Sequence, residues 1–236
     1  MTSDRIRVLA RQQLETELLL GLEFLPRPKA RGDSSPITTG IAAESNEQAL
    51  AELERRFSEV FPVCESLSGA TQPVFGEGNP DADLVFIGEA PGADEDRLGR
   101  PFVGAAGRKL DSIISAMGFQ RDQVYIANIL KARPPGNRNP LPDEVAAHGP
   151  FLAEQLLVIR PRVIVALGRP AAHFLLDSTA PISRLRGQWG CWEHEGVSID
   201  LMPTYHPAYI LRQYTQEVRR QVWHDMQQVM AKLQES

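Results

Sequence analysis

Three short apolar runs of the sequence are each followed closely by a side chain that can do chemistry: Glu89, Asn128 and His206. A carboxylate can orient a water molecule, and an imidazole can donate or accept a proton. An amide can donate and accept hydrogen bonds at once, as reading the edge of a pyrimidine would require. A fourth run ends in a Gly-Arg-Pro segment at residues 168–170, which offers no obvious catalytic group. The three side chains are therefore the candidates for a polar site, provided that the fold brings them together.

The apolar pattern predicts the elements that must position these side chains. From residue 84 onward, short apolar runs alternate with stretches of helical spacing, which is typical of a parallel sheet covered by helices on both faces. The predicted strands and helices are, in turn, residues 84–87, 124–127, 163–166 and 199–202, and residues 107–117, 142–159 and 217–233. The sequence thus predicts a three-layer α/β/α fold with a central, mainly parallel four-stranded sheet. Because ligands bind beyond the carboxyl ends of such strands, the candidate side chains are expected to face one pocket.

The N-terminal segment has a different pattern. Leucines at helical spacing predict an amphipathic helix within residues 1–25, and residues 26–46 have no apolar period and are predicted to be a flexible linker. A further helix opens the domain of residues 47–236, with Leu50 and Phe57 on its apolar face. The leucine face of the first helix is interpreted either as an ordinary packing surface or as a contact for a partner protein.

Length and composition restrict the class of protein. A chain of 236 residues, 42% hydrophobic and 23% charged, can form one well-buried domain. No apolar run approaches the ~20 residues that cross a bilayer, and the N-terminus does not resemble a signal peptide, so we expect a cytoplasmic protein without membrane attachment. The net charge of -5 disfavours a protein that coats nucleic acid non-specifically, although residues 97–138 are rich in Arg and Lys.

Each candidate side chain also has an ordinary structural interpretation. Glu89 could be a solvated loop residue, Asn128 the cap of a turn, and His206 a structural histidine before a proline. Phe102, in a Gly-Arg-Pro-Phe-Val-Gly segment, could be a core residue. Only the combination of these residues favours a functional site.

Five segments of the chain, taken in order, resemble the family 4 (iron–sulfur type) uracil-DNA glycosylases. They are Gly88-Glu89-Ala90-Pro91-Gly92, Gly99-Arg100-Pro101-Phe102-Val103-Gly104, Asn128, Arg133-Pro134-Pro135 and His206-Pro207-Ala208-Tyr209. The resemblance covers about residues 60–232 and implies the uracil-DNA glycosylase fold for the domain of residues 47–236. It also implies hydrolysis of the N-glycosidic bond of uracil in DNA, which releases uracil and leaves an abasic site for base excision repair. Glu89 favours family 4, because related families carry other residues at its position.

The resemblance implies a role for each matching position in the pocket. The two catalytic positions would be Glu89, which positions the attacking water or stabilises the cationic sugar, and His206, which donates towards O2 of the departing base. Phe102 would stack on uracil flipped out of the DNA, and Asn128 would hydrogen-bond its edge. The substrate-binding positions are Gly88, Ala90, Phe102 and Asn128.

Other positions are predicted to contact the DNA itself. The basic candidates for the backbone are Arg100, Arg133 and Arg138. Ile210 or Leu211 is the candidate wedge that fills the gap left by the flipped base, and ordinary packing of the following helix is the alternative. Glu95 is interpreted either as a support of the first loop or as a solvated residue.

The sequence departs from the family at the four cysteines that hold its cluster. The corresponding positions are Phe61, Cys64, Ala132 and His148, so only one thiol remains. Zinc on Cys64, His148 and Cys191 is disfavoured, because a structural zinc site needs four well-spaced ligands. We therefore expect no metal and no cofactor, a loop after Ala132 that is fixed by prolines and packing, and a packed thiol at Cys191.

The expected enzyme is a monofunctional, monomeric glycosylase acting on uracil in single- or double-stranded DNA. A non-catalytic member of the superfamily that binds damaged DNA is one alternative. A hydrolase for free nucleotides is another, because glycine-rich strand ends can also hold phosphates. The N-terminal helix is a candidate contact for a repair or replication partner.

Overall fold

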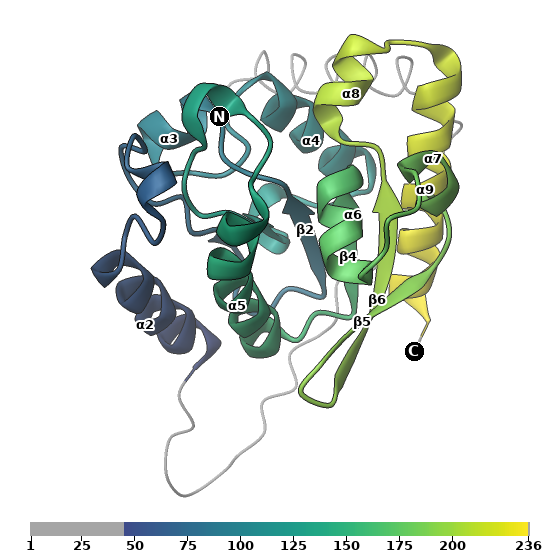
Figure 1. Ribbon diagram of the computed structural model, residues 1–236. Coiled ribbons are helices and arrows are strands. Elements are labelled where there is room, and N and C mark those ends of the chain that lie inside the picture. The colour runs from purple at the N-terminus through teal and green to yellow at the C-terminus, as the bar shows by residue number, and fades with distance from the viewer. Residues whose placement is uncertain (1–44, 236) are drawn as a thin grey trace, which may run out of the picture.

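A mixed sheet runs through the computed structural model, which describes residues 45–235 (Figure 1). The predicted N-terminal helix, and the predicted linker up to residue 44, lie outside the described residues. The strands are β1 (Glu77–Gly78), β2 (Leu84–Gly88), β3 (Tyr125–Asn128), β4 (Val163–Leu167), β5 (Gly190–His194) and β6 (Val197–Thr204). Their spatial order is β1-β3-β2-β4-β6-β5.

The four central strands are the four that the sequence predicts. β3, β2, β4 and β6 pair in parallel, with Val85 opposite Tyr125 on one side and opposite Ile164 on the other. The sheet itself is larger than the predicted four strands, because β1 and β5 add one antiparallel strand at each edge. β1 is only two residues long and β5 is buried at a single position, so neither carries the apolar run that marks a central strand.

Helices cover both faces of the sheet, as the three-layer prediction requires. They are α2 (Asn46–Glu59), α3 (Ala93–Leu98), α4 (Ala105–Ala116), α5 (Pro142–Ile159), α6 (Arg169–Leu176), α7 (Ile182–Leu185), α8 (Pro207–Arg212) and α9 (Gln216–Gln234). Successive side chains of a strand point to opposite faces. Val85 and Ile87 accordingly join the core under α5 and α6, whereas Leu84 and Phe86 join the core under α4 and α9. None of the helices in residues 45–235 is long and apolar enough to span a membrane.

Local sequence explains where the main helices start. Pro142 stands in the first turn of α5, where its missing N–H is not needed. Thr215 caps α9 by accepting a hydrogen bond from the backbone N–H of Val218, and Ser45 caps α2 in the same way through Gln48. The parallel pairing places the carboxyl ends of β2, β3, β4 and β6 at one edge of the sheet, and the loops that follow them enclose the site.

Candidate active site

A cavity of about 760 Å³ opens at the carboxyl edge of the parallel strands. Its volume lies within the range of pockets that bind small ligands. The cavity is lined by residues from the ends of all four central strands, including Glu89, Ala90, Phe102, Asn128, Gly168, Arg169 and His206. The structure therefore brings together the four side chains that the sequence singles out.

Glu89 follows β2 directly and is half-buried at the wall of the cavity. Its Oε1 atom is buried and has no hydrogen-bond partner within residues 45–235. Burial raises the pKa of this carboxyl above its ordinary value, and the positive charge of Arg169 opposes that rise. An acceptor atom without a partner beside a cavity is suited to hold a water molecule or another polar group.

Asn128 is the last residue of β3, and its side chain is buried beside the glycine that ends β2. Its Oδ1 atom also lacks a hydrogen-bond partner in the part of the chain that the structure describes. A Cβ atom on Gly88 would stand 2.3 Å from this oxygen and 2.5 Å from the ring of Phe102. Only glycine at position 88 leaves room for both side chains, which explains the glycine in the predicted set.

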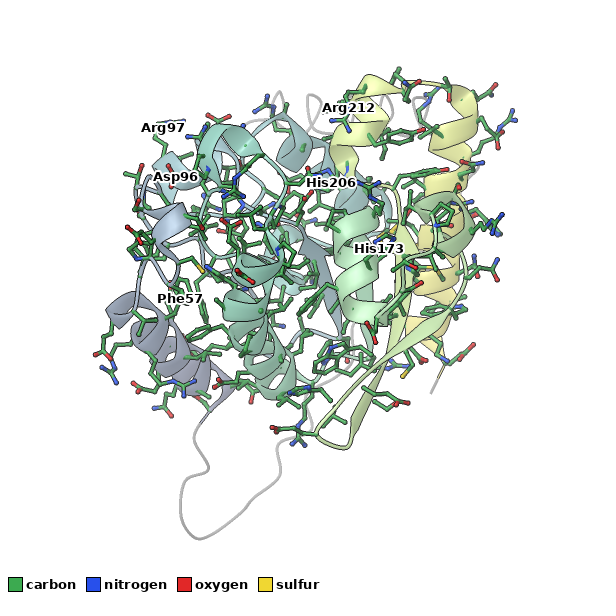
Figure 2. All side chains as sticks on the ribbon, in the orientation of Figure 1. Phe57, Asp96, Arg97, His173, His206 and Arg212 are labelled. Atoms are coloured by element: carbon green, nitrogen blue, oxygen red, sulfur yellow. The ribbon has the colours of Figure 1, made fainter. Side chains whose placement is uncertain are left out.

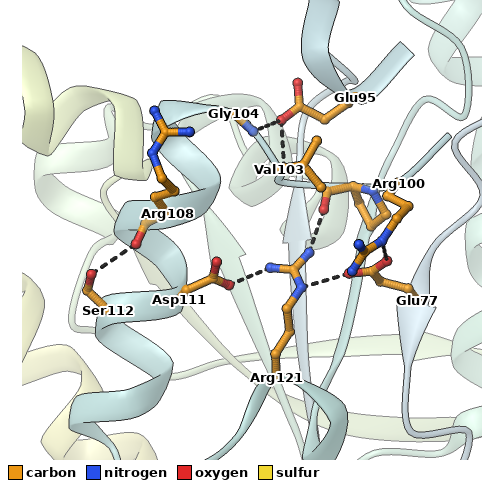
Figure 3. Close-up of polar contacts among 10 residues, drawn as sticks. Glu77, Glu95, Arg100, Val103, Gly104, Arg108, Asp111, Ser112 and Arg121 are labelled. Atoms are coloured by element: carbon orange, nitrogen blue, oxygen red, sulfur yellow. Dashed lines mark hydrogen bonds and ion pairs between the residues drawn. The ribbon is translucent and has the colours of Figure 1, made fainter. Parts of the chain in front are cut away.

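Phe102 is held at the cavity by an unusual backbone conformation and by Glu95. The residue has a φ of 51°, which a non-glycine residue rarely adopts, and it is 5% exposed. Oε1 of Glu95 accepts hydrogen bonds from the backbone N–H groups of Val103 and Gly104, both at 2.9 Å (Figure 3). Glu95 also accepts from Gly92 through Oε2, so it supports the loop, as one of its two interpretations proposed.

His206 caps α8 at the start of that helix (Figure 2). Its ring lies next to that of Phe102, with 5.7 Å between the ring centroids. Its Nδ1 atom accepts a hydrogen bond from the backbone N–H of Ala208 at 3.1 Å. Burial lowers the pKa of His206 to about 4, so the imidazole is neutral at pH 7. Because Nδ1 is an acceptor, the ring proton is on Nε2, which makes that nitrogen a neutral hydrogen-bond donor.

Two arginines at the rim of the cavity were not among the predicted site residues. Arg169 begins α6 and Arg212 ends α8, and both line the cavity. Neither side chain forms a hydrogen bond or an ion pair within residues 45–235. The sequence held the signal for Arg169, because it follows the third predicted strand at the same edge as the other candidates. The interpretation of that strand end as lacking a functional group overlooked its charge.

The three arginines predicted at the DNA backbone all have partners in the fold. Arg100 pairs with Glu77 at 2.7 Å and does not line the cavity (Figure 3). The guanidinium of Arg133 donates to Asn137 at 2.7 Å. Arg138 lines the cavity but makes hydrogen bonds of 2.8 Å and 2.5 Å to the buried carboxylate of one residue in α5, Glu144. DNA would therefore have to share these arginines with their present partners.

The two candidate wedge residues lie in different environments. Ile210 is 1% exposed and packs in the core under α4 and α9, which is the alternative that the sequence left open. Leu211 is 43% exposed on the same helix. Only Leu211 can reach into DNA without unpacking the core, so the wedge interpretation rests on this residue.

The residues at the four family cluster positions do not fit an iron–sulfur cluster. Ala132 is fully buried in the apolar core, and Phe61 and Cys64 pack against that core. His148 is buried and accepts a hydrogen bond from the backbone N–H of Lys131 through Nδ1 at 3.0 Å. One thiol, a methyl group, a phenyl ring and an engaged imidazole cannot supply four thiolates. Within residues 45–235, no three His, Cys, Asp or Glu side chains are grouped as metal ligands would be.

The second cysteine differs from its prediction. Cys191 was expected to be a packed thiol, but it is exposed on the edge strand β5. The prediction was wrong because side chains alternate along a strand, and in β5 the neighbouring Trp192 takes the buried position. Both cysteines are free thiols.

Comparison with known proteins agrees with the geometry of the cavity. The model of the uracil DNA glycosylase superfamily matches residues 75–227. The type-4 uracil-DNA glycosylase of Thermotoga maritima is 45% identical over 166 residues, which are 70% of this chain and 85% of that protein. The type-4 enzyme of Archaeoglobus fulgidus is 43% identical over 170 residues, 70% of this chain and 84% of that protein. This chain belongs to the type-4 branch of the uracil-DNA glycosylase superfamily.

Membership of this superfamily confirms the family resemblance and the predicted fold class. The matched segment contains Glu89, Phe102, Asn128 and His206, together with the four parallel strands that carry or precede them. It also contains Arg169, so this rim residue lies within the glycosylase core rather than in an added segment.

Proposed function

We propose that this protein hydrolyses the N-glycosidic bond of uracil in DNA, releasing uracil and leaving an abasic site for base excision repair. The observation that carries the proposal is a pair of buried acceptor atoms at one cavity, Oε1 of Glu89 and Oδ1 of Asn128, which have no partner among residues 45–235. Oε1 of Glu89 is suited to accept a hydrogen bond from a water molecule, and Oδ1 of Asn128 is suited to accept one from the N–H of a planar base. The relatives with the same family membership are named type-4 uracil-DNA glycosylases.

Base recognition follows from three side chains. Oδ1 of Asn128 accepts the N3–H of uracil, and the amide N–H₂ donates to O4 of the same edge. Phe102 supplies an aromatic face on which the flipped base stacks. His206 donates from Nε2 towards O2, in the orientation that its bond to the backbone of Ala208 fixes.

Bond cleavage uses the charge of Glu89 and the neutral donor of His206. The C1′–N1 bond breaks first, its electron pair leaves with uracil, and the hydrogen bond from Nε2 stabilises the resulting anion. Glu89 as an anion stabilises the cationic sugar and orients the water molecule that attacks C1′. The water leaves its hydroxyl on C1′ and loses one proton, and the uracil anion takes up one proton, so the products are balanced.

A release assay with a uracil-containing oligonucleotide tests this function. Glu89→Gln keeps the shape of the side chain and removes its charge, so we expect the excision rate to fall by about 10²–10³-fold. Undiminished excision by this variant would refute the catalytic role of Glu89. Tight binding of uracil-DNA by the unmodified protein, with no product, would instead support the non-catalytic alternative. Salt-insensitive turnover of a mononucleotide would support the hydrolase for free nucleotides.

We propose that the enzyme works without an iron–sulfur cluster or any other cofactor. The support is the chemistry of Phe61, Ala132 and His148 at three of the four cluster positions, which leaves Cys64 as the one cysteine among the four. Iron and sulfide analysis of the purified protein, together with its visible absorbance, is the test. Stoichiometric iron would refute the proposal, whereas full excision by iron-free protein would support it.

We further propose a monomer that accepts single- and double-stranded DNA in the cytoplasm, with residues 1–25 as the candidate contact for a repair or replication partner. Two free thiols are consistent with a reducing compartment. Light scattering tests the monomer. Deletion of residues 1–45 should leave excision on oligonucleotides unchanged and abolish a partner interaction in a pull-down. Loss of excision in this variant would contradict the assignment of partner binding to the N-terminal segment and of excision to the remaining domain.

A further inference from the structure

Lys131 is a fully buried lysine that the proposed mechanism does not use. Its exposed fraction is 0%, although lysine is among the residues least often buried in proteins. Removing an ammonium group from water is costly unless other polar groups replace its hydration. The structure supplies such groups on several elements, and they connect Lys131 to the strand that carries Asn128.

Lys131 is held at its backbone and at its side chain. Its backbone N–H donates to Nδ1 of His148 at 3.0 Å, and its carbonyl accepts from the backbone N–H of Val74 at 2.8 Å. Its Nζ donates to the backbone carbonyl of Asn128 at 2.9 Å and also to Oε1 of Gln155. One residue therefore ties the end of β3 to α5 and to the segment before β1.

Gln155 anchors the side chain of Lys131. Its Nε2 donates to the backbone carbonyl of Phe75 and to the hydroxyl of Tyr125, both at 3.1 Å. Because these two contacts occupy the amide N–H₂, the amide oxygen is turned towards Lys131. All four residues are buried, so water does not replace these bonds easily.

His148 is the anchor of the backbone of Lys131. Burial lowers the pKa of His148 to about 4, so its ring is neutral and Nδ1 is available as an acceptor. The ring packs against Phe57, with 5.4 Å between centroids, which fixes its orientation. His148 is one of the positions where the family resemblance implies a cluster cysteine, and here it makes a hydrogen bond instead of a metal bond.

The connection matters because Asn128 must hold its amide in the plane of a pyrimidine. The backbone beyond Asn128 stays paired with β2, since the N–H groups of Ile129 and Leu130 donate to the carbonyls of Gly88 and Glu89 at 3.0 and 3.1 Å. The carbonyl of Asn128 itself turns to Lys131. A shift of about 1 Å at a recognition group is enough to impair catalysis strongly.

We propose that Lys131, anchored by His148 and Gln155, is a positioning residue that fixes Asn128 for uracil recognition by hydrogen bonds within the protein, at the place where a metal cluster does not fit. The inference rests on the proposed function, because uracil is the ligand that Asn128 would recognise. It concerns the geometry of the residues described above and assigns Lys131 no contact with the substrate.

Lys131→Met tests this role, because methionine has a similar volume and no donor. Single-turnover excision should show a half-saturating concentration of uracil-DNA that is at least about tenfold higher, with a smaller fall in the maximal rate. The dissociation constant for abasic-site DNA, which lacks the base, should stay within about twofold. In an Asn128→Ala background, Lys131→Met should have little further effect on uracil recognition, because the two residues act as one unit.

Hydrogen exchange provides a readout that does not depend on activity. We expect faster exchange in a peptide covering residues 124–134 of Lys131→Met than in the unmodified protein. Val229→Ala is the control, since it truncates a fully buried side chain of α9 and lowers stability, and its core cluster contains none of Phe57, Phe75 and Tyr125, which contact the anchors of Lys131. His148→Leu should act in the same direction as Lys131→Met, and His148→Gln, which keeps an acceptor, should restore part of the protection.

The outcomes separate this inference from the proposed function. Unchanged exchange over residues 124–134 in Lys131→Met, or equal effects of Lys131→Met and Val229→Ala on uracil recognition, would overturn the positioning role. An unmodified protein that excises no uracil would refute the proposed function, and the exchange measurement would still decide whether Lys131 fixes the end of β3.

Discussion

Gly88→Ala tests the geometry of the recognition pocket with the smallest possible change. The added Cβ would lie 2.3 Å from Oδ1 of Asn128 and 2.5 Å from Cζ of Phe102, where ordinary contacts begin at 3.4 Å. Both side chains would have to move by about 1 Å. Overpacking of this kind costs about 1–3 kcal/mol of stability. A misplacement of 1 Å at recognition groups lowers the rate by about 10²-fold. We therefore expect a folded protein with a strongly reduced excision rate.

The assay compares Gly88→Ala with Gly69→Ala, a matched control. A Cβ on Gly69 meets nothing within 4 Å, so this variant should keep both stability and activity. Urea unfolding gives the stability of each variant, and single-turnover release of uracil gives the rate. If Gly88→Ala excises uracil at the rate of the unmodified protein, the packing of Asn128 and Phe102 against position 88 does not define the pocket.

Further predictions concern pH and the DNA surface. The excision rate should fall as the pH drops through the raised pKa of Glu89, because the anion is the active form. Since the charge of Arg169 lowers that pKa, the pH–rate profile of Arg169→Gln should show this acid limb displaced to higher pH. A limb in the same place would contradict the influence of Arg169. The pKa of Glu144 is lowered to about 2, so its contribution to stability is present above 4.5 and is lost as the pH falls towards 2. Urea unfolding should show this loss in the unmodified protein and its absence in Glu144→Gln. Leu211→Ala should reduce excision from double-stranded DNA more than from single-stranded DNA while leaving stability unchanged. Ile210→Ala should lower the free energy of unfolding by about 2–5 kcal/mol, and the reverse pattern for the two variants would exclude Leu211 as the wedge.

Much of the central fold could be predicted from local patterns. Strands buried on both faces need continuous apolar runs, and these marked β2, β3, β4 and β6 to within a few residues. The helices of residues 142–159 and 216–234 follow from their spacing and from Pro142 in the first turn. The edge strands escaped prediction because β1 has two residues and β5 buries one, so their pairing depends on the neighbouring strand.

The sequence by itself determined the family and the four pocket side chains, because their types and order follow directly from the chain. The sequence could not determine which arginine side chains already have partners within the fold. Arg100, Arg133 and Arg138 have partners, whereas Arg169 at the rim has no hydrogen bond or ion pair in the described part of the chain.

Only the tertiary structure decided these points, because each depends on residues distant in sequence that meet in space. Glu77 reaches Arg100 across 23 positions, and Gln155 reaches Lys131 across 24. The burial of Lys131, whose Nζ donates to the carbonyl of Asn128, is the clearest case. A lysine in a loop after a strand is ordinarily exposed, and nothing in its local sequence indicates that three segments close over it.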